Sequence, residues 1–262
     1  MAAWCAASSS VLFAQTLTYA PEPGVTFRYR TSNTLTVSQR VLNRDNHYTL
    51  RSAGILGLTL LSVGPRLEWR LGFQEISLEI EGAFPTPRVD QLRGTVVTVT
   101  TTPQGVVLDA LSSGVVPPGI GSQYMERAAA AFFPRLPEGQ GSTWTDTLTV
   151  IEVLQGVTTE VETTVVYSIA DTSAVAGRSV VPVEYEGRIE LTGAGTVGGS
   201  RVSLEGGGSV VGHYLFDPAD RIFDLHEQEQ VVESTLILEG ADRGSVAIPS
   251  RQVLRARAER LF

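Results

Sequence analysis

The sequence predicts a mainly β protein (α+β) built on one large curved antiparallel sheet or half-barrel, with one short connecting helix. Three observations lead to this fold class. Apolar and polar side chains alternate with a period of two beyond residue 24, turn residues interrupt this alternation, and a single segment has a convincing helical pattern. Because most of the expected strands are apolar on one face only, an antiparallel sheet is favoured.

The strand pattern is clear in some segments and ambiguous in two. Residues 25–30 and 67–73 alternate large apolar side chains with polar or charged ones, as expected for half-buried strands. Residues 54–63 are apolar on both faces and fit a central strand or a short buried helix, but their two glycines favour the strand. The C-terminal residues 253–262 fit either a strand face or a helical stripe, and we expect a strand.

The predicted helix lies near residues 122–133, where a run of alanines follows two prolines and ends at a third. It would connect two halves, 21–116 and 137–262, that share short matches at a nearly constant offset. An internal duplication and a chance resemblance between β-rich segments are both open. Because no low-complexity linker divides the chain, we expect a single β-rich domain over residues 15–262.

The first fourteen residues are small and apolar, and they resemble the end of a secretory signal peptide with a cleavage point after Ala14. No arginine precedes Arg28, so the charged start of such a peptide is missing, and a frayed terminus is the alternative. The only cysteine, Cys5, lies in the segment 1–14, so the cleaved chain would hold no thiol. We expect an exported protein of the periplasm or cell envelope.

Composition and motifs exclude several function classes. The net charge of −8 argues against a general nucleic-acid binder, which needs a basic face. No apolar run reaches the ~18 residues of a membrane helix, so no transmembrane span is expected. Residues 193–198, GAGTVG, have dinucleotide-loop spacing but precede no plausible helix, so we expect a hairpin or bulged strands and no cofactor. No nucleophile–base set of known type is present, and we expect no enzyme.

The richest polar stretch, residues 213–229, contains three candidate metal ligands, His213, Asp224 and His226. A hairpin with its loop at 217–220 would place His213 opposite Asp224 and all three candidates on a solvent face, with aromatic neighbours facing the core. Metal ligation and a cross-strand polar pair are both open, and the pair is favoured because the remaining histidine is remote in sequence. We therefore expect no metal site.

Aromatic and basic residues supply the remaining candidates. The aromatic candidates for contact with an apolar ligand are Trp69, Phe73, Phe132 and Trp144. Such rings more often fill a sheet core, so a pocket wall and a core plug are both open. The C-terminal arginines are expected on a solvated strand face that balances Glu-rich strands, with contact to anionic lipid or a partner as the alternative: Arg251, Arg255, Arg257 and Arg260.

A strand entry at Gly141–Trp144, a hairpin with Gly212, Tyr214, Phe216 and Asp217, the leader-like start and the single helix resemble uncharacterised bacterial secreted β-rich proteins. In overall layout they are similar to the lipoprotein-carrier superfamily of LolA and LppX type, where a curved antiparallel sheet wraps over helices and leaves an apolar cavity. The resemblance implies a non-enzymatic envelope protein that binds an apolar ligand or lipid in the concave face of its sheet. The alternative is a structural or interaction module with a filled core and an envelope protein partner.

Overall fold

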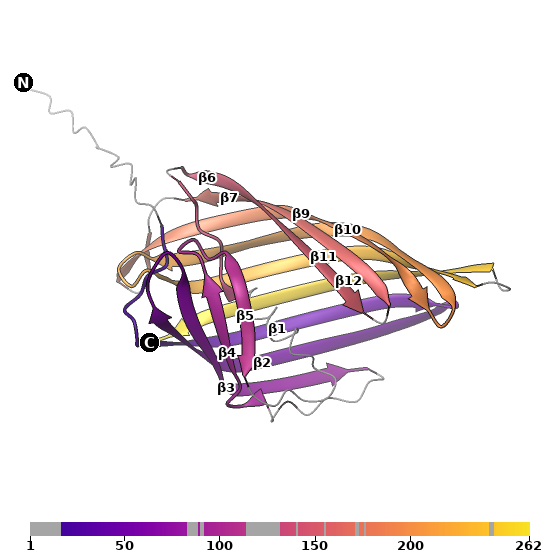
Figure 1. The fold of residues 1–262 in the computed structure, drawn as a ribbon, viewed down its shortest axis with the longest axis horizontal. Helices are drawn as coiled ribbons and strands as arrows, with labels where there is room; N and C mark the ends of the chain where they lie inside the picture. The colour runs from indigo at the N-terminus through magenta and orange to yellow at the C-terminus, as the bar shows by residue number, and fades with distance from the viewer. Residues whose placement is uncertain are drawn as a thin grey trace, which may run out of the picture.

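The computed structural model describes residues 17–82, 89, 92–113, 132–139, 141–154, 156–170, 173–175, 177–240 and 244–262. These residues form a strongly curved antiparallel sheet of twelve strands (Figure 1). The predicted antiparallel β fold is therefore confirmed. The helix expected near 122–133 is not among the elements of the described part, and of that range only Phe132 and Phe133 are described.

The first group of strands comprises β1 (Thr26–Val41), β2 (Arg44–Ser62), β3 (Leu67–Glu81), β4 (Val96–Thr101) and β5 (Val107–Ser113). The second group comprises β6 (Thr143–Leu154), β7 (Val157–Ile169), β8 (Ser173–Val175), β9 (Arg178–Val197), β10 (Ser200–Asp217), β11 (Ile222–Gly240) and β12 (Gly244–Leu261). The order across the sheet is β5-β4-β3-β2-β1-β12-β11-β10-β9-β7-β6, and β8 pairs with β9. Strands were correctly expected at residues 54–63 and at the C-terminus.

The order of the strands describes an up-and-down meander that is open on one side. Within β1 to β5 and, apart from the short β8, within β6 to β12, consecutive strands pair with one another, and the first strand β1 also pairs with the last strand β12. The two edges of the sheet, β5 and β6, follow one another along the chain but are not paired. Figure 1 shows the result, a curved sheet with long central strands and shorter strands β4 and β5 at one edge.

Strand β1 shows how the sequence separates the two faces of the sheet. Phe27 and Tyr29 are buried, whereas Arg28 and Arg30 between and after them are exposed. We call the face that carries Phe27 and Tyr29 the inner face and the opposite one the outer face. Because directly paired residues of an antiparallel sheet share a face, the register extends this assignment from β1 to every strand.

The core fills one end of the inner face, where β1 begins and β2 ends. We call it the aromatic end, after its buried rings Tyr19, Tyr29, Trp69, Phe132, Phe133, Phe216 and Phe223. Most ring pairs meet edge to face, such as Tyr29 and Phe132 with centroids 5.1 Å apart. Their polar atoms are satisfied: Trp69 Nε1 donates to Thr101 Oγ1 over 2.8 Å, and the Tyr29 hydroxyl donates to the Phe223 carbonyl over 2.6 Å.

Beyond the aromatic end, the six longest central strands continue to their hairpin turns. We call this region the distal half, and it comprises residues 31–39, 46–54, 187–197, 200–212, 226–240 and 244–258. The turn between β9 and β10 holds Gly198 and Gly199 at φ of 57° and 85°, the left-handed conformation that matches the twist of paired strands. The motif at 193–198 thus forms the end of β9 and this hairpin turn, as expected.

The matches that indicated a duplication do not all occupy equivalent positions. One match pairs residues 94–97 with 208–211, and another pairs Asp109 with Asp224. Val97 is buried on the inner face of β4, whereas its counterpart Val211 is 49% exposed on the outer face of β10. Asp109 is exposed on β5, whereas its counterpart Asp224 is buried. Both halves begin a meander, but that order is common among antiparallel sheets, and the duplication stays a prediction.

Candidate functional site

The inner face of the distal half holds no Arg, Asp or Glu side chain at any described position. Its members are apolar or neutral polar, and most are partly exposed. The larger apolar ones include Leu35, Val37, Leu50, Ile189, Leu191, Val202, Leu204, Val210, Val232, Leu236, Leu238, Val246, Ile248 and Leu254. The neutral polar ones include Asn33, Gln39, Ser52, Gln228, Gln230, Ser234, Ser250 and Gln252. Together they make a broad apolar surface with scattered hydrogen-bonding groups.

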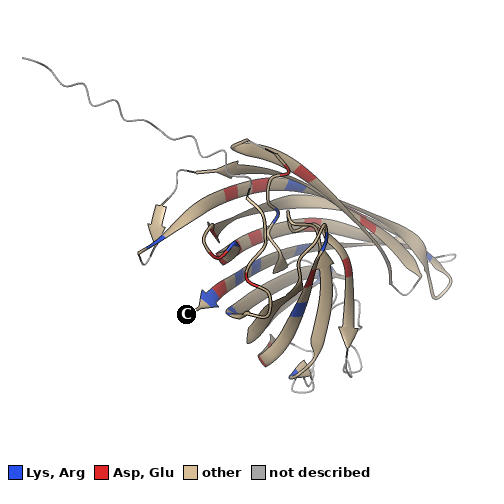
Figure 2. Cartoon of the chain, turned by 60° about the vertical axis from the view of Figure 1, so that its left-hand side comes forward, with Lys and Arg blue, Asp and Glu red and all other residues tan. Residues whose placement is uncertain are grey.

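The outer face of the same strands carries the charges, which Figure 2 shows spread along the sheet. Arg255 Nε lies 2.6 Å from Glu229 Oε2, Arg251 pairs with Glu233 at 3.4 Å, and Arg257 pairs with Glu227. Three of the four C-terminal arginines thus lie on a solvated face as expected, although their partners are on β11. Such exposed pairs contribute little stability each, so this arrangement mainly keeps the outer face hydrated.

Two hollows of about 400 and 680 Å³ lie over this outer face. Ser32, His213, Glu229 and Arg257 are among the residues that line the smaller one. Charged residues also line the larger one, near the hairpin turn between β1 and β2. Their polar walls do not suit an apolar ligand, which the inner face suits better.

An aromatic row marks the boundary between the aromatic end and the distal half. We define it as Trp144, Tyr167, Tyr185 and His226, which come from β6, β7, β9 and β11. The Trp144 and Tyr167 rings stack with centroids 4.9 Å apart and an interplanar angle of 3°. The Tyr185 hydroxyl lies 2.8 Å from His226 Nε2 and donates to Gln228 Oε1 over 3.3 Å.

Gly212 of β10 makes the reach of Tyr185 possible. A Cβ atom at this position would lie 2.4 Å from the Tyr185 hydroxyl and 2.4 Å from the Glu227 carbonyl oxygen. The Tyr185 ring therefore crosses over β10 at Gly212, where no side chain blocks its path, to reach β11. The contact between Tyr185 and His226 therefore requires a glycine at position 212.

Burial keeps the polar members of the aromatic row uncharged. Desolvation, with a smaller contribution from His213, lowers the pKa of His226 to about 4. Desolvation likewise raises the pKa of Tyr167 and Tyr185 far above the usual value for a phenol. At neutral pH this boundary therefore offers neutral hydrogen-bonding groups and no net charge.

Two buried donors beside the aromatic row have no hydrogen-bond partner within the part of the chain that the structure describes. They are the indole nitrogen Nε1 of Trp144 and Nη1 of Arg135. Arg135 Nε lies 3.3 Å from Asp146 Oδ2, and Asp146 lies two residues after Trp144 on the same face of β6. Buried donors are rarely left unpaired, because their desolvation then has no compensation.

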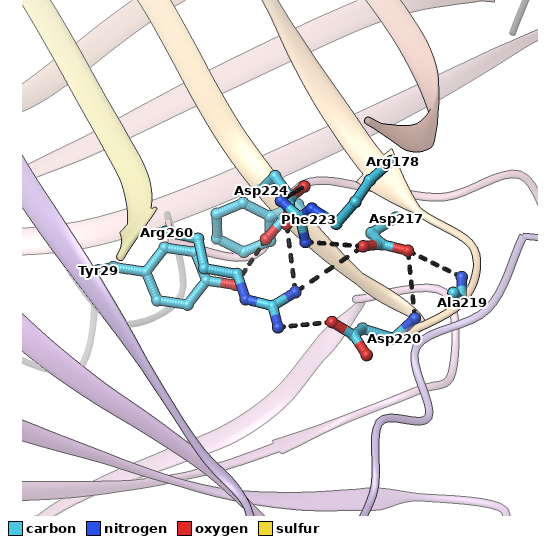
Figure 3. Close-up of polar contacts among 8 residues, drawn as sticks. All are labelled: Tyr29, Arg178, Asp217, Ala219, Asp220, Phe223, Asp224 and Arg260. Carbon is cyan, nitrogen blue, oxygen red and sulfur yellow. Dashed lines mark hydrogen bonds and ion pairs between the residues drawn. The ribbon is translucent and has the colours of Figure 1, made fainter. Parts of the chain in front are cut away.

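A partly buried ionic cluster closes the aromatic end (Figure 3). Arg178 bonds Asp217 at 3.0 Å and Asp224 at 2.7 Å, while Arg260 bonds Asp224 at 3.2 Å and Asp220 at 2.5 Å. It ties the starts of β9 and β11 to the ends of β10 and β12. Burial raises the pKa of Asp224 against the opposing effect of Arg178 and Arg260. Because each carboxylate is held by an arginine, the cluster serves the fold.

The predicted exposed position of Arg260 is therefore wrong. Its side chain is only 10% exposed and lies over the Phe27 ring, 4.5 Å from the centroid. The sequence alternation of β12 does place residue 260 on the inner face, but the charge led us to expect solvent. Arginine tolerates such a place when its donors are all engaged and its plane stacks on a ring.

The structure separates the three predicted metal ligands. His213 lies on the outer face, 3.6 Å from Glu227; His226 lies on the inner face; and Asp224 belongs to the ionic cluster. The predicted hairpin register was wrong, because His213 pairs with Glu227 instead of Asp224 and a bulge shifts the pairing after Leu215. Within the described ranges, no three His, Cys, Asp or Glu side chains are placed to hold a metal ion.

Of the four predicted ligand-contact aromatics, three lie in or against the core of the aromatic end and one lies at its boundary. Trp69 and Phe132 are buried in the aromatic end, and Phe73 packs partly buried against the same core. Only Trp144 lies at the boundary with the distal half. The predicted signal segment 1–14 lies outside the described residues. Sequence reasoning missed Tyr185, His226 and Gln228 as a group, since Gly212 alone does not reveal which ring crosses it.

Comparison with known proteins yields matches among solved structures only; no family model and no curated protein matches. A Neisserial surface protein A aligns at 7% identity and a TM-score of 0.25, over 88% of this chain and 96% of that one. The β domain of a Bordetella autotransporter aligns at 12% identity and a TM-score of 0.26, over 90% and 100%. An outer membrane channel from Pseudomonas putida aligns at 10% identity and a TM-score of 0.21, over 92% and 97%. Likeness at this level assigns neither a family nor a function.

The comparison corrects one expectation. We expected no transmembrane span because no apolar run is long enough for a membrane helix. An outer membrane channel is among the similar structures, and strands of alternating polarity cross a bilayer in ~9–11 residues without any long apolar run. The expectation, which rested on run length alone, is therefore wrong. Among the described residues, no helix has the length and apolar character needed to cross a membrane.

Proposed function

We propose that the protein is a non-enzymatic carrier of the cell envelope that holds an apolar ligand or lipid against the inner face of the distal half. The observation that supports this is the separation of charge between the two faces. Within the distal half, the described Arg, Asp and Glu side chains project from the outer face, while the inner face presents only apolar and neutral side chains. A sheet face of this composition favours an apolar occupant over water.

The size of the surface fits an acyl chain. Each CH₂ group that leaves water contributes about 0.8 kcal/mol to the free energy of binding. A long chain laid along the strands therefore gains enough to offset the entropy that it loses on binding. The strands run along this face for the whole length between the aromatic row and the hairpin turns, and neutral groups such as Gln228 and Gln230 can bind its polar atoms.

The test uses two lysine variants on neighbouring positions of β11. Leu236→Lys puts a charge on the inner face, whereas Thr235→Lys puts the same charge on the outer face, where Glu233 and Glu205 carry the opposite one. Each protein is purified without detergent from its own envelope and examined by native mass spectrometry for bound lipid. We expect lipid on the wild type and on Thr235→Lys, and at least tenfold less on Leu236→Lys. Equal occupancy of the two variants, or a ligand-free wild type, would contradict the proposal.

A second candidate function, an interaction module for an envelope protein, is favoured by the free edge of β6. In the described part of the chain β6 pairs only with β7, over twelve residues and without a bulge. Ile151 and Val153 on its outer face are 65% and 71% exposed. An extended partner segment adds readily to such an edge. Thr147→Pro should remove partner binding at this edge and leave the lipid content unchanged. If the protein is only a carrier, no partner binds at this edge and the substitution has no binding to remove.

A further inference from the structure

The two donors beside the aromatic row that have no partner among the described residues point to a ligand with a hydrogen-bond acceptor. Trp144 Nε1 and Arg135 Nη1 are both buried, and the salt bridge between Arg135 and Asp146 links them on one face of β6. Neither donor group can accept a hydrogen bond, so a ligand atom that satisfies them must be an acceptor oxygen or nitrogen.

The surroundings of these donors disfavour a charged acceptor. Asp146 already balances the charge of Arg135, so an anionic group added there would leave a net negative charge in a partly buried place. The next groups along the aromatic row, Tyr167, Tyr185 and His226, add no positive charge at neutral pH. The inner face beyond them also carries no arginine at its described positions.

We infer that the ligand of the inner face is an uncharged ester-type lipid, whose carbonyl oxygen accepts hydrogen bonds from Trp144 and Arg135 and whose chain lies along the distal half. This inference rests on the proposed function and narrows it to one lipid class. The carbonyl replaces the hydrogen bonds that both donors lost to burial, and the ester brings no charge that would need a partner. A fatty acid carboxylate satisfies the first condition but fails the second.

The test compares three ligands with similar chains: methyl palmitate, palmitate and heptadecane. They offer an uncharged acceptor, a charged acceptor and no acceptor, respectively. Dissociation constants of the delipidated full-length protein are measured at pH 8 by displacement of a fluorescent apolar dye. We expect methyl palmitate to bind at least tenfold more tightly than palmitate, and about five- to tenfold more tightly than heptadecane, as one or two hydrogen bonds to a neutral acceptor allow.

A matched pair of variants tests whether the N–H group of Trp144 donates the hydrogen bond to the ligand carbonyl. Trp144→Phe keeps a ring that stacks on Tyr167 but removes the N–H, whereas Thr145→Val changes the next residue on the exposed outer face. We expect Trp144→Phe to lower the preference for methyl palmitate over heptadecane at least threefold and to leave the Tm unchanged or higher, because an unsatisfied donor is gone. Thr145→Val should change neither quantity.

The outcomes separate the inference from the proposal on which it rests. Palmitate binding as tightly as methyl palmitate, or an unchanged preference in Trp144→Phe, would overturn the inference while the carrier function stands. Failure of all three ligands to displace the dye would overturn the carrier function as well.

Discussion

The aromatic end and the distal half are made from the same strands, with the same alternation and the same inner face, yet one is filled and the other is open. Tyr29 in the aromatic end is fully buried, whereas Leu35, six residues further along β1, is partly exposed. The two regions differ in whether another segment of the chain packs over the inner face of the sheet. Tyr19 and the segment with Phe132 and Phe133 pack over the aromatic end, while no described segment packs over the distal half in the same way. Alternation thus determines which side chains face inwards, but separate segments determine whether that face is buried.

The largest expected effect comes from truncating one inner-face side chain in each region. Trp69→Ala should lower the free energy of unfolding by about 3–5 kcal/mol, because it removes a fully buried ring and its bond to Thr101. Leu236→Ala should cost only about 1 kcal/mol, because that side chain is already partly in water. Urea unfolding measures both values. Equal losses would show that the distal half is as tightly covered as the aromatic end.

The ionic cluster supplies a comparison between buried and exposed charge. Arg260→Gln should cost about 2–4 kcal/mol, because Asp217 and Asp224 then share Arg178 alone in a largely buried place and Asp220 loses its arginine. Arg255→Gln on the outer face should change stability little, since that arginine and its partner are well solvated. Thermal unfolding at low ionic strength compares the two. A small loss for Arg260→Gln would mean that the cluster does not hold the aromatic end together.

Gly212 tests the boundary between the two regions. Gly212→Ala should cost about 1–3 kcal/mol, because the new Cβ overlaps the Tyr185 hydroxyl and the Glu227 carbonyl. Gly72→Ala is the control, since a Cβ there meets no atom within 4 Å. Displacement of Tyr185 should also raise the pKa of His226 by admitting water, which NMR titration measures. An unchanged pKa of His226 would show that the structure accommodates the new Cβ atom without moving Tyr185.

The smallest expected effect is a pH dependence at the same boundary. The pKa of His226 is lowered from 6.5 to about 4 in the folded protein, so the unfolded chain binds the proton more readily between these values. The free energy of unfolding should therefore fall as the pH drops from 6.5 towards 4, by about 1–2 kcal/mol after allowance for the partial exposure of the ring. His226→Gln should flatten this slope in chemical denaturation series. A slope that survives the substitution would belong to other groups.

Much of the fold could be predicted from the sequence because strand alternation is local. Residues 26–30, 67–73 and 253–258 each show which side chains share a face, and the structure confirms those faces, whereas Val25 and Phe262 at the ends of these patterns are exposed. The pairing of β1 with β12 could not be predicted, because it depends on contacts between segments that no local pattern connects. The cover of the aromatic end by Tyr19 and Phe133 is likewise a long-range property.

The candidate site was less predictable than the fold. The register of β10 with β11 depends on a turn in which Asp217 binds two backbone N–H groups, Arg221 adopts a positive φ, and a bulge follows Leu215. Each of these shifts the pairing, and a shift moves histidines between faces. The charge separation, in contrast, was present in the alternation of glutamates in β11 and arginines in β12, and could have been read from it.

The central position of β1 and β12 has a consequence for how the chain folds. The two half-sheets can grow from adjacent hairpins, but joining them brings Arg28 beside Leu261, nearly the whole chain away. Such distant contacts form slowly, since the entropy of closing the large loop is lost before they stabilise anything. A circular permutant that begins at Phe132, joins Phe262 to Leu17 by a linker and ends at β5 would keep the cover of the aromatic end and make every pairing between long strands sequential. It should refold faster than the natural chain at similar stability.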